Sequence, residues 1–111
     1  MKIYFINDNQ KRLGILNKLI KCEFVPIIEK NEYNFRATKN DFVIVSDFEI
    51  QNPNNESLKK YNNLIVLTES KTEETISVLA DEYNTKDVIY SLLDEDYIVQ
   101  RIIKYISKNM E

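Results

Sequence analysis

Histidine is absent from this sequence of 111 residues, and cysteine and glycine occur only once each. Without histidine, the chain has no imidazole for acid–base catalysis or for binding a metal. The single cysteine, Cys22, excludes an intrachain disulfide and a zinc site made of several cysteines. The single glycine, Gly14, excludes the glycine-rich phosphate loops of nucleotide-binding proteins. The composition therefore argues against the classes of enzyme that depend on any of these features.

Long hydrophobic runs are also missing. No apolar stretch approaches the roughly 20 residues that a membrane-spanning helix needs. The chain begins with a short apolar run that meets an acid at Asp8, and it lacks the longer apolar core and cleavage site of a signal peptide. We therefore expect a cytoplasmic protein that does not contact a membrane.

The net charge of −3 conceals an uneven distribution. Residues 1–40 contain eight Lys or Arg and four Asp or Glu, a net +4, whereas residues 41–111 contain seven and fourteen, a net −7. Such asymmetry can steer association between copies or with a protein partner. We expect no direct nucleic-acid partner, because the chain is acidic overall and its basic residues are not interleaved with aromatic ones.

The stretch from Asp41 to Phe48 is the most informative part of the chain. Its apolar, mostly β-branched run is too short for a helix and does not alternate, which predicts a strand buried on both faces over residues 42–46. The run ends at a carboxylate, Asp47. In open parallel α/β sheets, ligands bind at the carboxyl ends of the strands.

The rest of the chain alternates between strand and helix patterns. Apolar residues at helical spacing predict helices over residues 9–21 and 71–83 and a last helix that begins at Asp94 or Glu95. Pro26 predicts that the second strand lies at a sheet edge. Further strands are expected near residues 2–7, 24–28, 64–68 and 88–90, with short helices around 33–38 and 57–61. This order predicts one α/β domain over residues 1–111, with a parallel sheet and right-handed crossovers.

Caps and buried faces can be predicted as well. Asp8 or Asn9 is expected to cap the first helix, and Ser70 with Glu73 forms a capping-box pattern before the second. The buried faces are predicted to be Leu13, Leu16, Leu19 and Ile20 in the first helix and Ile76, Leu79, Ala80 and Tyr83 in the second. Lys11, Arg12, Lys18 and Lys21 are expected on a solvated helix face.

Polar residues follow the inner strands. Because parallel strands end at the same edge of a sheet, Asp8, Asp47 and Thr68 are expected to converge. Two carboxylates about 4 Å apart repel by roughly 4 kcal/mol at an effective dielectric near 20. Solvent, a raised carboxyl pKa or a divalent cation must relieve this repulsion, and Mg²⁺ prefers such oxygen ligands. Asp8 has an alternative interpretation as a helix cap only.

The order of elements and the residues at the strand ends resemble the receiver domains of two-component response regulators over essentially the whole chain. The resemblance implies a flavodoxin-like, three-layer fold with a five-stranded parallel sheet in the order 2-1-3-4-5, here with the second and third helices shortened. It implies that Asp47 is at the phosphoacceptor position, that Asp8 and Asp47 are metal ligands, and that Thr68 is the hydroxyl residue that contacts the phosphoryl group.

The chain also departs from the receiver pattern. Asn7 stands where the family has a first acid, and Ser91 stands where it has a lysine that pairs with the phosphoryl group. Glu69 occupies a place usually kept small, and Val88 fills the aromatic switch position. Loss of the lysine removes a charged hydrogen bond worth about 1.5–3 kcal/mol. With Glu69 adding negative charge nearby, both changes oppose a stable aspartyl phosphate.

These departures lead to a first hypothesis, an atypical receiver-like interaction domain that is not an enzyme. It would act independently of phosphorylation, through a protein partner or as a homodimer formed by residues 87–108. Such domains occur at the N-termini of transcriptional regulators and of pilus-assembly localisation ATPases. The alternative is a working phosphoacceptor domain that uses Asp8, Asp47 and weakly held Mg²⁺. A phosphotransfer subunit of similar fold would need a cysteine or histidine nucleophile after the first strand, and neither is present there.

Overall fold

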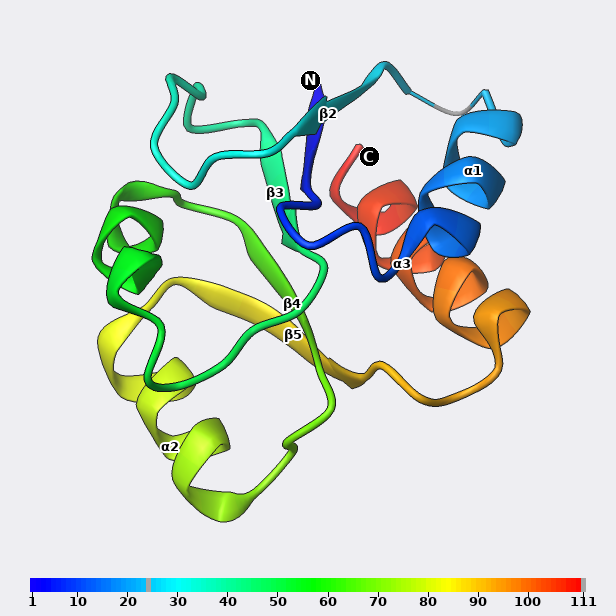
Figure 1. Ribbon diagram of the computed structural model, residues 1–111. Coiled ribbons are helices and arrows are strands. Elements are labelled where there is room, and N and C mark those ends of the chain that lie inside the picture. The colour runs from blue at the N-terminus through cyan, green and yellow to red at the C-terminus, as the bar shows by residue number, and fades with distance from the viewer. Residues whose placement is uncertain (24, 111) are drawn as a thin grey trace.

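A five-stranded parallel sheet forms the centre of the computed structural model, which describes residues 1–23 and 25–110 (Figure 1). The strands run in the order β2-β1-β3-β4-β5. This order, with helices on both faces, confirms the flavodoxin-like α/β fold that the sequence predicts. The strand bounds are β1 Ile3–Ile6, β2 Ile27–Lys30, β3 Phe42–Val45, β4 Leu64–Thr68 and β5 Thr85–Tyr90.

The helices form the outer two layers. Helices α1 (Leu13–Lys21) and α3 (Glu95–Asn109) lie side by side on one face of the sheet, and α2 (Glu73–Glu82) lies on the other with the 3₁₀ helix η1 (Pro53–Lys60) (Figure 1). The second and third helices of the fold are reduced as predicted. Residues 31–41, where at most a short helix around 33–38 was expected, contain no helix, and η1 takes the third position.

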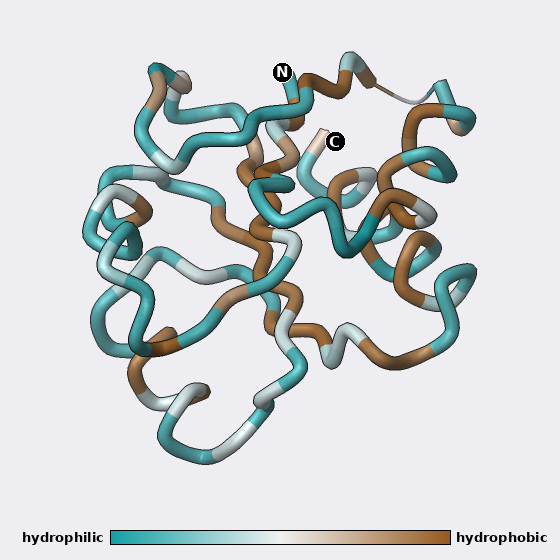
Figure 2. The backbone as a smooth tube through the Cα atoms, viewed as in Figure 1, coloured by the Kyte–Doolittle hydropathy of each residue, from teal (hydrophilic) through white to brown (hydrophobic). Residues whose placement is uncertain are grey.

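The central strand β3 has both of its faces covered. Val43 and Val45 point to the side of α2 and η1, and Ile44 points to the side of α1 and α3, because successive side chains of a strand alternate. All three are completely buried, as the apolar run predicts. The hydrophobic segments accordingly run through the strands and along the helix surfaces that face them (Figure 2).

Helix α1 differs from its prediction at its start. It begins at Leu13, and its N-cap residue Arg12 makes no side-chain capping hydrogen bond, so neither Asp8 nor Asn9 caps it. The chain first turns at Gln10, whose φ is 57°. This later start also changes the buried face: Leu16 and Leu19 are buried with Ile15, whereas Leu13 and Ile20 are 44% and 50% exposed.

The other boundaries are close to those predicted. Pro26 precedes β2, which is an edge strand as expected, although it begins at Ile27; Phe24, in the predicted strand, lies outside the described residues. Strand β5 begins three residues earlier than predicted. Asp94 caps α3, since its carboxylate accepts a hydrogen bond from the Tyr97 N–H at 3.2 Å.

The prediction for α2 was less accurate. Its N-cap is Thr72, which accepts a hydrogen bond from the Thr75 N–H at 3.2 Å, so the Ser70 capping box is not formed. Because the helix starts at Glu73, Thr75 and Leu79 face the sheet. Ile76 is 40% exposed and Ala80 is also exposed, contrary to the predicted buried face. Tyr83 packs partly buried, with its ring edge-on to Phe48.

Candidate functional site

The register of the sheet brings the strand-end residues to one edge. Ile6 of β1 pairs with Val45 of β3, so Asp8 and Asp47 each follow the paired residues by two positions. Thr68, the last residue of β4, pairs with Tyr90 of β5, so Ser91 lies next to it. The predicted residues therefore gather along the carboxyl edge, but their side chains have different environments.

Asp47 is buried and already has two polar partners. Its side chain is 3% exposed. Asn9 donates a hydrogen bond from Nδ2 to Oδ2 of Asp47 at 2.8 Å, and the Lys11 ammonium lies 3.3 Å from the same oxygen. The hydrogen bond and the charge of Asp47, followed by the charge of Glu69, raise the pKa of Lys11. The repulsion expected at this edge is thus relieved by an ammonium group of the chain itself.

Lys11 and Asn9 were not identified as site residues from the sequence. Lys11 was expected on a solvated helix face, but it precedes α1 and belongs to the turn after β1. The positive φ of Gln10 and a 3.2 Å hydrogen bond from the Lys11 N–H to Oδ1 of Asn9 shape this turn. The run Asn7-Asp8-Asn9 directly after the strand end was the available signal, because Asn and Asp favour turns as well as helix caps.

Arg12 brings a second cation to the same edge. Its side chain is 13% exposed, and its Nη2 lies 3.0 Å from Ser91 Oγ and 3.0 Å from Glu69 Oε1. A guanidinium group from the β1–α1 turn therefore lies beside the end of β5, where receivers carry a lysine. It also pairs with Glu69, the acid that the sequence suggested would repel an anion.

The Thr68 hydroxyl is held by the backbone. It donates a hydrogen bond to the Phe48 carbonyl at 2.9 Å and accepts one from the Ser70 N–H at 3.1 Å, with the side chain fully buried. A hydroxyl has a single proton to donate. In this arrangement Thr68 has no proton to offer a group on Asp47, and it ties the β3–η1 turn to the end of β4.

Asp8 is exposed, and its nearest interaction is with Tyr33. Burial, and then the negative charges of Asp8 and Asp47, raise the pKa of the Tyr33 hydroxyl well above its usual range. Tyr33 also accepts a hydrogen bond from Asn52 Nδ2 at 3.2 Å. The carboxylates of Asp8 and Asp47 thus both act on one buried hydroxyl.

The site does not fit the divalent cation that the resemblance implies. Among residues 1–23 and 25–110, no group of three or more acidic or thiol side chains is arranged to hold a metal. The Lys11 ammonium already occupies the Oδ2 side of Asp47, and a like charge there disfavours a second cation. The Mg²⁺ expectation therefore gains no support from the geometry.

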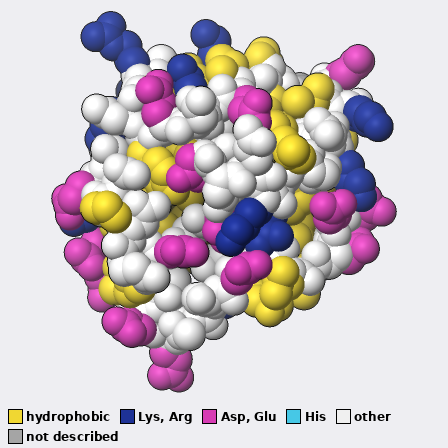
Figure 3. Space-filling view, viewed as in Figure 1, with side chains coloured by type: hydrophobic (Ala, Val, Ile, Leu, Met, Phe, Trp, Pro, Cys, Tyr) yellow, Lys and Arg dark blue, Asp and Glu magenta, His cyan; other side chains and the backbone are white. Residues whose placement is uncertain are grey.

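A cavity of about 220 Å³ opens beside Asp47, between the β3–η1 turn and the start of α2. Its lining includes four acids, Asp47, Glu49, Glu69 and Glu74. Figure 3 shows Lys and Arg side chains near the centre of this face, with Asp and Glu side chains around them. The negative lining of the cavity disfavours entry of an anionic phosphate donor.

Comparison of the chain with family models, curated proteins and solved structures found no match. None of the described helices is long and apolar enough to cross a membrane.

Proposed function

We propose that this chain is a receiver-like interaction domain that works without phosphorylation. The observation that carries the proposal is the state of Asp47: its carboxylate is buried, and one of its oxygens bonds to both Asn9 and Lys11. A nucleophilic carboxylate must expose an oxygen to the phosphate donor. Here that would require breaking a charge-assisted contact inside an acidic opening.

The pairing of Arg12 with Glu69 and Ser91 supports the same proposal. These contacts link the β1–α1 turn to the ends of β4 and β5, and the Thr68 hydroxyl links β4 to the turn after β3. The residues at the phosphoacceptor, hydroxyl and lysine positions, Asp47, Thr68 and Ser91, each have an internal partner. We infer that the carboxyl edge serves as a closed structural network.

Intact mass spectrometry after incubation with acetyl phosphate and Mg²⁺ tests this proposal. The wild-type protein should gain no phosphoryl group, whereas a typical receiver domain treated in parallel should gain one. The double variant Asn9→Ala/Lys11→Ala serves as a comparison, because its Asp47 carboxylate has lost both partners and can react with the phosphate donor without breaking these contacts. An adduct on the wild type that disappears in Asp47→Asn would overturn the proposal.

One observation favours the alternative, a working phosphoacceptor. The Lys11 side chain is 47% exposed on a flexible stem, so its ammonium can swing away from Asp47 or follow a phosphoryl group attached there. The same mass measurement decides between the two functions, because only the alternative predicts a stoichiometric adduct that depends on Asp47.

We further propose a homodimer through residues 87–108 as the mode of interaction. Strand β5 and helix α3 line two hollows on this side of the protein, one shared with α2. The exposed apolar side chains Ile76 and Tyr97 lie among charges of both signs, including Asp87 and Lys104. A surface of this kind can be complementary to its own copy, as a two-fold dimer requires.

Concentration-dependent light scattering tests the dimer. The wild type should approach the mass of a dimer at high micromolar concentration, and Ile76→Lys should shift it toward the monomer. Ile20→Lys is a matched control, because Ile20 is an isoleucine of comparable exposure, 50% against 40% for Ile76, and lies on α1, outside residues 87–108. A wild type that stays monomeric, or equal effects of the two substitutions, would contradict this surface.

A further inference from the structure

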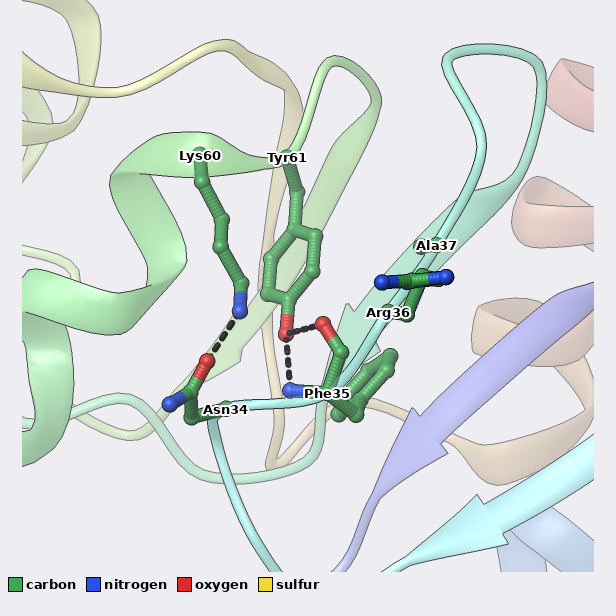
Figure 4. A pocket seen from close by; sticks show the side chains of 6 residues that line it. All are labelled: Asn34, Phe35, Arg36, Ala37, Lys60 and Tyr61. Carbon is green, nitrogen blue, oxygen red and sulfur yellow. Dashed lines mark hydrogen bonds between the residues drawn. The ribbon is translucent and has the colours of Figure 1, made fainter.

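The segment that replaces the second helix leaves a hollow of about 470 Å³ on the surface beside β2. It is lined by Asn34, Phe35, Arg36, Ala37, Lys60 and Tyr61 (Figure 4). The Tyr61 hydroxyl forms the wall by hydrogen bonding to the Phe35 N–H at 3.0 Å and to the Tyr33 carbonyl at 2.7 Å. The shape of the hollow is thus defined by the structure, since the buried Tyr61 side chain holds the backbone that lines it.

The charges of this hollow are all positive. Arg36 and Lys60 line it, and Lys30 lies at its side with its ammonium 5.4 Å from the centroid of the Phe35 ring. Among the described residues, no carboxylate lies within 4.0 Å of any of these three cations. By contrast, Lys11 and Arg12 at the carboxyl edge are each paired with an acid. These three are therefore available to an anion from outside.

Lys60 is held in position within the hollow. Its ammonium donates to Oδ1 of Asn34 and lies 5.3 Å from the centroid of the Tyr61 ring (Figure 4). An ammonium has three protons to donate, so two remain for a ligand. A cation that is already oriented loses less freedom when it binds an anion.

A second hollow, of about 440 Å³, adjoins the first and has the opposite charge. Its lining includes Asp8 and Glu32 but no cation, together with the polar side chains of Asn31, Asn54 and Ser57. Asn34 lines both hollows. Together the two neighbouring hollows, which we call the groove, are basic at one end and acidic at the other.

We propose that this groove binds an extended peptide segment of a partner protein that carries carboxylates at one end and a basic side chain a few residues along. The carboxylates pair with Lys60 and Arg36, and the basic side chain pairs with Glu32 and Asp8. Amide side chains between the two ends can hydrogen bond to the peptide backbone in either direction. This site is separate from the proposed dimer surface and does not depend on it.

The charge pattern favours a peptide over a nucleic acid. A nucleic-acid strand carries a phosphate at every nucleotide, so part of it would lie against Asp8 and Glu32. The ring of Phe35 also packs against the rings of Tyr4 and Tyr61, with centroids 4.8 Å and 5.0 Å away, so a stacked base would compete with these contacts. A peptide with both signs of charge meets neither obstacle.

Fluorescence anisotropy with labelled hexapeptides at low salt tests the proposal. The probes are a dipolar peptide, Glu-Glu-Ser-Ser-Lys-Lys, and an all-acid peptide, Glu-Glu-Ser-Ser-Glu-Glu. The dipolar peptide should bind more tightly, and binding should weaken with salt because exposed charges are screened. Lys60→Gln combined with Arg36→Gln should weaken its binding by at least about tenfold, equivalent to about 1.4 kcal/mol.

The variant Glu32→Gln gives the sharpest test, because its effects should differ in sign. It should weaken binding of the dipolar peptide and strengthen binding of the all-acid peptide. Lys71→Gln and Lys104→Gln are control variants that each remove one exposed cation outside the groove. Circular dichroism confirms that each variant is folded.

Three outcomes would overturn the proposal: no binding of the dipolar peptide at millimolar concentration, equal binding of the two peptides, or tighter binding of a single-stranded oligonucleotide of equal length. Equal loss in the control variants would show only a general charge effect and would overturn it as well.

Discussion

The guanidinium group of Arg12, which precedes α1, lies 3.0 Å from the hydroxyl of Ser91, which follows β5. These residues are 79 positions apart in the sequence. Receivers have a lysine at the position of Ser91, so a serine there predicts a loss of positive charge at this edge. Arg12 of the β1–α1 turn supplies the positive charge instead, and Lys11 supplies a second cation to Asp47.

This relationship changes the meaning of the atypical residues. The Ser91 hydroxyl accepts a hydrogen bond from the Arg12 guanidinium, and Glu69 balances the charge of that arginine. Two of the departures from the receiver pattern, Ser91 and Glu69, thus share one partner in Arg12. This is the physical basis on which we propose a domain that interacts with partners without a phosphorylation step.

The core assignment predicts a large cost for truncating Ile44. The side chain is completely buried in β3, so Ile44→Ala should lower the free energy of unfolding by about 2–5 kcal/mol. Ile20→Ala is the matched control, because Ile20 is 50% exposed, and it should change stability by less than about 0.5 kcal/mol. Urea denaturation measures both. Similar costs for the two substitutions would contradict the burial described for β3.

Thr68 and Thr85 allow the effect of a threonine-to-valine substitution on stability to be compared at two sites that differ in their hydrogen bonds. Thr68→Val removes a hydroxyl that bonds to the Phe48 carbonyl and the Ser70 N–H, and should cost about 1–3 kcal/mol because those buried groups lose their partner. The Thr85 hydroxyl is buried without a partner among the described residues, so Thr85→Val should be neutral or stabilising. Thermal melts give the comparison. A larger loss for Thr85→Val would refute it.

The buried hydroxyl of Tyr33 predicts a pH dependence. Burial and the nearby carboxylates raise its pKa in the folded protein. The folded state then holds this proton more tightly than the unfolded chain does. Its stabilising contribution is complete below the ordinary tyrosine pKa of about 10 and is lost as the pH rises above that value.

The urea midpoint should therefore fall less between about pH 8 and pH 11 in Tyr33→Phe than in the wild type. The wild type loses part of the contribution of the Tyr33 hydroxyl in this pH range, whereas the variant has no such contribution to lose. The comparison uses the change with pH, since the substitution also removes the hydrogen bond from Asn52 and lowers stability at both pH values. An unchanged dependence on pH would contradict the burial of this hydroxyl.

Asp87 and Arg101 form the best-aligned ion pair of the proposed dimer surface. Two nitrogens of the guanidinium donate to the two carboxylate oxygens at 2.8 Å and 2.6 Å, and the side chains are 18% and 32% exposed. A double-mutant cycle with Asp87→Asn and Arg101→Gln should give a coupling energy of about 1 kcal/mol, at the upper end for partly exposed pairs. A coupling near zero would indicate that the pair does not persist in solution.

The fold was largely predictable from local patterns. Five short apolar runs separated by helical periodicity were enough to indicate a parallel α/β sheet, and Pro26 was enough to assign β2 to an edge. The central strand could be identified because its residues are apolar at every position, which only burial on both faces explains. Such patterns depend only on residues that are close in the sequence, and for this reason they can be recognised without the tertiary structure.

Helix starts and helix faces were less predictable. One turn residue with positive φ, Gln10, delays α1, and the cap at Thr72 sets the rotation of α2. A shift of one or two residues rotates a helix by 100° or more at 3.6 residues per turn. Ile76 and Ile20 were therefore predicted to be buried and are exposed.

At the site, the sequence by itself determined which residues lie at the carboxyl edge, because that follows from the order and direction of the strands. It did not determine which charges meet there. The contacts of Lys11 with Asp47 and of Arg12 with Ser91 join residues 36 and 79 positions apart. Electrostatic interactions depend on distance in space and on burial, and only the tertiary structure decides both.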